Sequence, residues 1–375
     1  MLTETVAGRT YDYTHNVGRG AQSGMGFNYP NAMTFAPDGT VYITNRGSET
    51  ISNVGWNRTG VGQRITKVTI GDEWGQEEFL GEYSRYGNGD GQLIWPAGIA
   101  SNDQGEVFVT DEWLNRVSVF DKDDNLVRSF STLQDGDPEP NGASGIAIAS
   151  NGTIYVTDSR SHQVRLFKND GTFINSFGDK GVSEGQFDSP WGITIDNAGK
   201  VYVADFNNHR VQKFSADGKF EQQIGRPGNK RGELNGPTDV AVDPDGDIYV
   251  CDWSANRWDR GKVHIFTPEG QFLTALVGDA QKLSQWAQMT VDANDDYAKR
   301  RQSSQLGVSP SAARRRARPG AAPVAHRAED HRQGQGQGTT QDGRRTDHGP
   351  QPVGGPPGDD TCRLLLQRLE EPGPE

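Results

Sequence analysis

The chain has 375 residues, of which 33% are hydrophobic and 23% charged, and its formal net charge at pH 7 is −12. Most of the negative charge lies before residue 284, and an acidic body repels phosphate backbones, so we do not expect a nucleic-acid partner. The sequence has neither a signal peptide nor an apolar run of about 20 residues that would span a bilayer. We therefore expect a cytoplasmic protein that does not use a membrane.

The N-terminal thirty residues contain the end of a pattern that returns later in the chain. Residues 17–30 match residues 224–237, which link one repeat to the next. We therefore predict that residues 10–17 form the last strand of a repeat whose first three strands do not precede it.

Five copies of the full pattern follow, each with a turn glycine before a short alternating apolar run. The glycines are Gly39, Gly105, Gly152, Gly199 and Gly246, and the runs are TVYITN, EVFVTD, TIYVTD, KVYVAD and DIYVCD. The last four glycines are 47 residues apart, whereas the first step is 66 residues. The first copy therefore carries an insertion, which we place at 46–63.

A single copy contains four strand signals, because short runs of β-branched and aromatic residues alternate with Asp-Gly or Asn-x-Gly turns. In the copy that starts at residue 190, the runs lie at 192–196, 201–205, 210–214 and 220–224. Four short antiparallel strands in a repeat of about 40–50 residues are typical of one blade of a β-propeller. The fold class is therefore all-β.

The repeat resembles the NHL family. The resemblance rests on VTDSRSHQVRLFKNDGTFINSFG at 156–178, on VYVADFNNHRVQKFSADGKFEQQIG at 201–225, and on the linkers GNGDGQLIWP and GVSEGQFDSP. It extends from about residue 17 to residue 278. It implies a ring of usually six blades, closed by an N-terminal strand, which serves as an interaction platform. A more distant resemblance links the chain to amidating-lyase propellers.

The last blade of such a ring is missing from the sequence. We predict an NHL-type propeller at 1–283, with five full blades and the N-terminal strand of a sixth. Residues 284–375 form a low-complexity tail that is rich in Arg, Gln, Gly and Pro and is expected to be disordered. A frame shift near 297–301 would explain the change, and the other reading frames would test it. The open blade edge would then allow oligomerisation.

One face of the ring is the expected binding surface. The connections between the second and third strands of a blade, and those between blades, emerge on the same face, which we call the loop face. These connections are long and hold aromatic side chains, which recognition surfaces use, although packing between blades is the alternative. The candidates are Trp56 and Arg58 in the insertion, and Trp95, Trp113, Trp191, Phe206 and Trp253 in the other loops.

Metal binding has weaker support in the sequence. His162 and His209 share one repeat position and are the only metal-ligand candidates, but no third ligand accompanies them, so we predict no cofactor and keep Zn²⁺ or Ca²⁺ as the alternative. The aspartates that end the second strands recur in four blades, and we expect them to accept backbone N–H bonds. Arg116, Arg210 and Arg257 recur five residues after these aspartates and are expected to partner them or the neighbouring blade. Cys251 is expected to be a small buried side chain.

Two functions from different classes follow. The first, which we favour, is a scaffold that binds a protein or a small molecule through the loop face. The second is a metal-dependent lyase or hydrolase, because the resemblance to amidating lyases implies zinc held by histidines close to the axis. The inner-strand runs AMTFA, GIASN, GIAIA, GITID and DVAVD contain no histidine, so those ligands have no counterpart here. Lactonase-type propellers share the architecture without a matching set of carboxylates.

Overall fold

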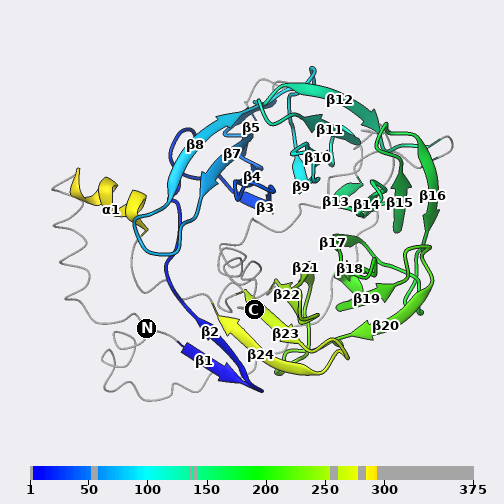
Figure 1. Ribbon diagram of the computed structural model, residues 1–375. Coiled ribbons are helices and arrows are strands. Elements are labelled where there is room, and N and C mark those ends of the chain that lie inside the picture. Colours follow the sequence, from blue (N-terminus) through cyan, green and yellow to red (C-terminus); the bar gives the residue numbers. More distant parts are fainter. Residues whose placement is uncertain are drawn as a thin grey trace, which may run out of the picture. The chain divides into compact units, whose positions relative to one another are not determined.

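The computed structural model describes residues 3–51, 58–134, 137, 142–253, 261–277 and 284–293. These residues form an all-β, five-bladed propeller (Figure 1). Each blade is an antiparallel sheet whose strands pair in chain order from the innermost to the outermost. The five predicted blades are confirmed, and each predicted turn glycine lies between the first two strands of its blade.

The strands of blades 1 to 3 have the following bounds: β3 (Pro30–Phe35), β4 (Val41–Asn45), β7 (Arg64–Thr69) and β8 (Glu78–Tyr83); β9 (Pro96–Ser101), β10 (Val107–Asp111), β11 (Arg116–Phe120) and β12 (Leu126–Ser131); β13 (Ala143–Ile148), β14 (Ile154–Asp158), β15 (Gln163–Phe167) and β16 (Phe173–Phe177). Those of blades 4 and 5 are β17 (Pro190–Ile195), β18 (Val201–Asp205), β19 (Arg210–Phe214) and β20 (Phe220–Ile224); β21 (Pro237–Val242), β22 (Ile248–Asp252), β23 (Lys262–Phe266) and β24 (Phe272–Val277). A 3-10 turn, η1 (Phe206–Asn208), follows β18.

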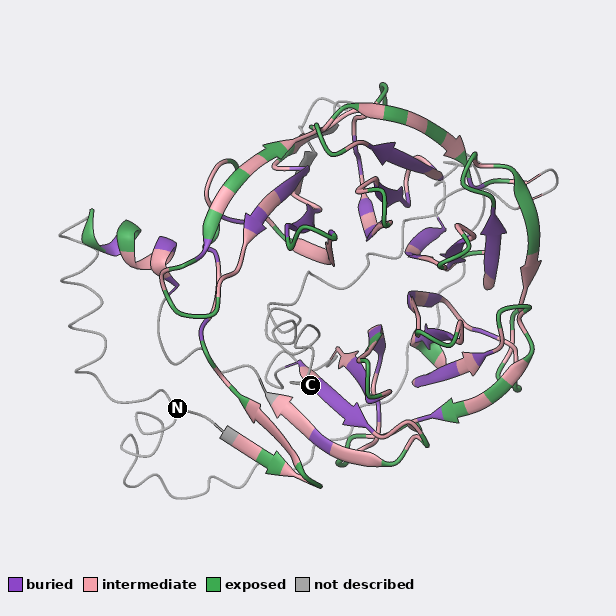
Figure 2. Ribbon diagram, in the orientation of Figure 1, coloured by how far each residue is buried: buried purple, intermediate pink, exposed green. Residues whose placement is uncertain are grey.

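The core lies between neighbouring blades, because a four-stranded sheet cannot bury both of its own faces. Phe108 and Val117 of blade 2, for example, pack with Ile146 and Val156 of blade 3. Corresponding clusters join blades 1 and 2, 3 and 4, and 4 and 5. The second strands are buried almost throughout, whereas the outermost strands alternate between half-buried and exposed residues (Figure 2).

Glycines on the inner strands allow the blades to approach one another closely. A Cβ placed on Gly98 would stand 2.6 Å from the carbonyl oxygen of Ser144 in blade 3. A Cβ placed on Gly145 would collide in the same way with the carbonyl oxygen of Trp191 in blade 4. In blades 2 and 3 the third residue of the inner strand is therefore glycine because the backbone of the next blade occupies the space of a side chain.

The prediction for the N-terminal strand is wrong in its extent and its partner. The strand β2 (Arg9–Asp12) pairs with β1 (Thr3–Val6) in a separate two-stranded hairpin, and the residues from Tyr13 to Arg19 form no strand. The physical reason is that an outermost strand needs an adjacent third strand for its backbone hydrogen bonds, and the described residues contain no such strand of a sixth blade. The match of 17–30 to the later linkers is confirmed, because Gly20 bridges to Phe27 as Pro227 bridges to Leu234.

The insertion of blade 1 forms a hairpin of its own. It consists of β5 (Ser48–Ile51) and β6 (Arg58–Val61), which are paired antiparallel between β4 and β7. Arg58 begins β6, while Trp56 lies outside the described residues. The insertion therefore leaves the ladder between β4 and β7 intact.

A short helix, α1 (Gln285–Asp292), lies at the start of the stretch that was expected to be a disordered tail. Its Trp286 is 2% exposed and packs against Phe27 and Val41 beside blade 1. The first residues after 283 therefore do bury a side chain, while 294–375 lie outside the described residues. In the part of the chain that the structure describes, no helix has the length and apolar composition to cross a membrane.

Candidate functional site

A cavity of about 400 Å³ lies along the axis between the five inner strands. Its wall is mostly apolar, because the inner strands present small and β-branched residues there. Ala32, Ile99, Ile146, Ile193 and Val240 are examples, one from each blade. Three of the five inner strands carry glycine at their third position.

At the loop face, blades 1 and 2 contribute a cation, a carboxylate and an aromatic pair. The Arg46 guanidinium lies 5.1 Å from the ring centroid of Trp95 and forms an ion pair of 2.9 Å with Glu112. The Ser144 hydroxyl donates to Glu112 at 3.1 Å. Trp95 and Trp113 contact each other edge to face, with centroids 5.1 Å apart. Arg46 and Glu112 line the cavity.

Blades 4 and 5 contribute a row of stacked aromatic rings. The centroids of Trp191 and Phe206 are 5.2 Å apart, and those of Phe206 and Trp253 are 6.1 Å apart, with interplanar angles of 20° and 28°. All three side chains are half-buried, and Trp191 and Trp253 line the cavity. The structure thus brings the predicted loop aromatics into two groups, one on each side of the axis. Of these aromatic residues, Trp191 and Trp253 line the cavity, and their role in recognition stays a prediction.

Asp239 is a cavity residue that the sequence analysis missed. It stands at the third position of β21, where blades 2, 3 and 4 have Gly98, Gly145 and Gly192. Its Oδ1 accepts a hydrogen bond from the Val240 N–H at 2.9 Å. Burial raises the pKa of Asp239 to about 6, and that single N–H bond opposes the shift. The departure from glycine was visible in the aligned repeats and was the available signal.

Cys251 lies beside Asp239, because the two residues are cross-strand partners in β21 and β22. It is half-buried and lines the cavity, so the prediction of a buried side chain holds only in part. Lys262 and Asp252, which are partners across β22 and β23, also line the cavity. Their opposite charges offset each other, which leaves Asp239 as the additional charge on this wall.

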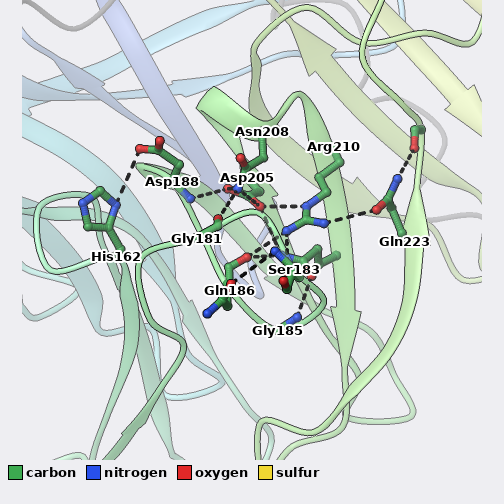
Figure 3. Close-up of polar contacts among 12 residues, drawn as sticks. His162, Gly181, Ser183, Gly185, Gln186, Asp188, Asp205, Asn208, Arg210 and Gln223 are labelled. Atoms are coloured by element: carbon green, nitrogen blue, oxygen red, sulfur yellow. Dashed lines mark hydrogen bonds and ion pairs between the residues drawn. The ribbon is translucent and has the colours of Figure 1, made fainter.

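The aspartates at the ends of the second strands have the predicted structural role. Asp111 accepts the Ile94 N–H at 2.7 Å and the Leu114 N–H at 2.9 Å. Asp205 accepts the Asp188 N–H at 2.8 Å and pairs with Arg210 at 2.9 Å (Figure 3). These aspartates therefore fasten the linker between blades to the second strand.

Arg116 and Arg210, at the same repeat position, both donate to carbonyl oxygens of the linker: Arg116 to Gly89 and Gln92, and Arg210 to Ser183 and Gln186. Arg210 also pairs with Asp205, while Arg257 lies outside the described residues.

The two predicted metal-ligand histidines have other roles in the fold. Nδ1 of His162 accepts the Ser189 N–H at 3.0 Å, and burial lowers the pKa of His162, so the neutral ring suits this bond. Figure 3 shows the ring beside Asp188. His209 adopts a left-handed backbone conformation that ends η1. Among the described residues, no three His, Cys, Asp or Glu side chains gather into a group that would hold a metal ion.

Comparison with known proteins locates the repeat. The family model described as NHL repeat matches residues 93–120, 141–167, 187–214 and 234–257. Each match begins just before the inner strand of one of blades 2 to 5 and extends at least through the second strand. A comparison with curated proteins finds no match.

Solved structures with a similar arrangement share little sequence with this chain. A protein of unknown function from Bacteroides caccae is 13% identical, with a TM-score of 0.48 over 66% of this chain and 81% of that one. A streptogramin B lyase is 15% identical, with a TM-score of 0.46 over 72% and 88%. A chain of a nidogen/laminin complex is 19% identical, with a TM-score of 0.45 over 66% and 80%. Similarities of this size leave the activity open.

Four successive blades of the propeller, blades 2 to 5, thus carry matches to the NHL repeat.

Proposed function

We propose that this protein is a binding scaffold whose axial cavity holds a small organic molecule at the loop face. The observation that carries the proposal is the cavity itself. Its volume of about 400 Å³ lies within the range of pockets that enclose small ligands. Apolar walls with a few convergent polar groups are the usual composition of such pockets.

The loop face supplies the means of selection. Trp191 and Trp253 offer broad apolar surfaces at the cavity, and the pair of Arg46 and Glu112 offers oriented hydrogen-bonding groups. A protein partner was the other option from the sequence. A concave site of this volume favours a small molecule over a protein, since protein interfaces are broad surfaces of roughly 800 Å² on each partner.

The lyase or hydrolase alternative stays a prediction without a supporting observation. Neither His162 nor His209 lines the cavity, and their described contacts stabilise the linker and η1.

The proposal is tested by screening a library of small metabolites for compounds that raise the melting temperature of the purified protein. Ligands that bind only the folded state stabilise it. We expect such compounds to act on the wild type and on Ala198→Trp, an exposed turn variant, but not on Ala241→Trp. Ala241 lines the cavity and its side chain is exposed there, so the indole would occupy ligand space. Equal responses of both variants, or no active compound, would contradict cavity binding.

A further inference from the structure

We propose that the ligand of the axial cavity is an organic cation, an amine or quaternary ammonium, bound between the Asp239 carboxylate and the aromatic rings of Trp191 and Trp253. The inference rests on the proposed function and names the chemical class of its ligand. Three observations carry it: the place of Asp239, its lack of a cationic partner, and the contrast with the opposite wall of the cavity.

The place of Asp239 is one where blades 2, 3 and 4 have glycine and blade 1 has Ala32. Gly98, Gly145 and Gly192 each face the backbone of the following blade, and a Cβ on Gly192 would collide with Oδ1 of Asp239. The Asp239 carboxylate therefore lies against Gly192 in the inner strand of blade 4. Gly192 is the residue that follows Trp191 in the chain. Blade 5 has room for this side chain because no further inner strand of the described residues follows β21.

Asp239 has no cationic partner in the part of the chain that the structure describes. Among the described residues, its carboxylate accepts one hydrogen bond, from the Val240 N–H, and forms no ion pair. A carboxylate in an apolar cavity with one donor is unfavourable unless another positive group compensates it. Burial accordingly raises its pKa to about 6, which still leaves it mainly ionised at neutral pH. A bound cation would supply the missing charge.

The opposite wall of the cavity, formed by blades 1 and 2, combines a carboxylate and an aromatic ring with a cation from the protein itself. There the Arg46 guanidinium lies over the ring of Trp95 and pairs with Glu112. Aromatic faces attract cations through their quadrupole, and the attraction grows when water is excluded. On the wall of blades 4 and 5, Trp191, Trp253 and Asp239 line the cavity, and no cation of the described residues pairs with Asp239. A ligand cation would complete the same combination there.

The size of the cavity limits the ligand to a small molecule. We therefore choose two pairs of probes that share a shape and differ in charge. The first pair is choline and 3,3-dimethylbutan-1-ol, and the second is phenethylamine and 2-phenylethanol. Binding of each probe to the full chain is measured by calorimetry and by tryptophan fluorescence at pH 7.5.

We expect at least one cation to bind tenfold or more tightly than its neutral counterpart. Asp239→Asn should remove that preference while leaving the affinity for the neutral probe within about twofold. The matched control is Asp245→Asn, which removes the same charge from an exposed turn of blade 5 and should change neither affinity. Trp253→Phe should retain more of the cation affinity than Trp253→Leu, and circular dichroism should verify that every variant folds.

The two proposals fail in different ways. If cations and neutral probes bind equally and Ala241→Trp blocks both, the cavity is a binding site but the ligand is not selected by charge, and the inference is overturned. If neither cation binds at millimolar concentration, the inference is also overturned. If metabolites that stabilise the wild type stabilise Ala241→Trp equally, the proposed function itself fails.

Discussion

Among the described residues, blades 1 and 5 each have an adjacent blade on one side, and the chain covers their other faces by different means. Blade 1 packs against Trp286 of α1, whose ring also contacts Phe79 with centroids 6.3 Å apart. Blade 5 packs against the N-terminal hairpin, through Tyr11 in an apolar cluster and through the ion pair of Arg9 with Asp247. Figure 1 shows β2 beside β24. The outer face of blade 1 is thus covered by an aromatic side chain, whereas that of blade 5 is covered by apolar contacts and an ion pair.

The same two blades differ at the cavity. Blade 1 extends Arg46 to a carboxylate of blade 2, whereas blade 5 presents the carboxylate of Asp239. In the middle of the array the next blade requires glycine at that position, as Gly145 demonstrates. The end of a repeat array is released from this constraint, so an end blade is where a new functional group can enter without disrupting the ring.

The largest effect is expected at the aromatic anchor of blade 1. Trp286→Ala should lower the free energy of unfolding by about 3–5 kcal/mol, because it empties a fully buried aromatic site. Urea denaturation followed by circular dichroism measures this loss. Met289→Ala on the same helix is the control, since Met289 is 51% exposed and should cost less than about 0.5 kcal/mol. Equal effects of the two would mean that α1 does not anchor blade 1.

Exchanging residues between blades tests whether the third position of an inner strand in the middle of the array must be glycine. Gly145→Asp should cost about 3 kcal/mol, because its Cβ would collide with a backbone carbonyl that cannot move independently of blade 4. Asp239→Gly should change the stability by less than about 1 kcal/mol or raise it, since it removes a desolvated carboxylate. Both are measured by urea denaturation. A large loss in Asp239→Gly would show that Asp239 holds blade 5 together instead.

The pH dependence of folding stability distinguishes two groups of blade 5, Asp239 and His264, because burial shifts their pKa values in opposite directions. Burial raises the pKa of Asp239 to about 6, so the folded state binds its proton more readily than the unfolded state and gains stability as the pH falls through 6 toward 4. Burial, and then the charge of Lys262, lowers the pKa of His264 to about 4, so the folded state loses stability as the pH falls from about 6.5 toward 4. Each contribution amounts to about 1.4 kcal/mol per unit of pKa difference.

Because the two contributions to stability change with pH in opposite directions, variants of Asp239 and His264 should deviate from the wild type in opposite directions. Relative to the wild type, Asp239→Asn should lose stability more steeply as the pH falls from 6 to 4. His264→Gln should lose it less steeply over about the same interval. Denaturant unfolding at half-unit steps of pH measures both curves, and parallel curves for all three proteins would contradict the assignment.

The smallest effect is expected at the internal cation of blade 1. Glu112→Gln removes the partner of Arg46, and we expect a loss of about 1–2 kcal/mol, between the values for exposed and for buried ion pairs. The control is Glu184→Gln in an exposed linker, which should change the stability by less than about 0.5 kcal/mol. If the two variants are equally stable, the ion pair with Glu112 does not hold Arg46 in place. Blades 1 and 5 would then not differ in having a carboxylate stabilised by a cation.

Much of the candidate site followed from the sequence, and some of it did not. The loop aromatics Trp95, Trp191 and Trp253 were predicted because their loops emerge on one face. Asp239 was overlooked because an acidic residue in one copy has no meaning until the glycines of the other copies are known to face a neighbouring backbone. Trp286 was assigned to a tail because a single helix with one aromatic residue has no evident partner in the sequence.

The sequence by itself determined the blades, because their strand alternation, turn glycines and fastening aspartates act within one repeat of about 47 residues. Only the tertiary structure decided what covers blades 1 and 5, and that Asp239 shares a cavity with Trp191 and Trp253. These features depend on surfaces that lie far apart in the chain. Their contact energies exist only once the blades have formed, and no local pattern of residues records them.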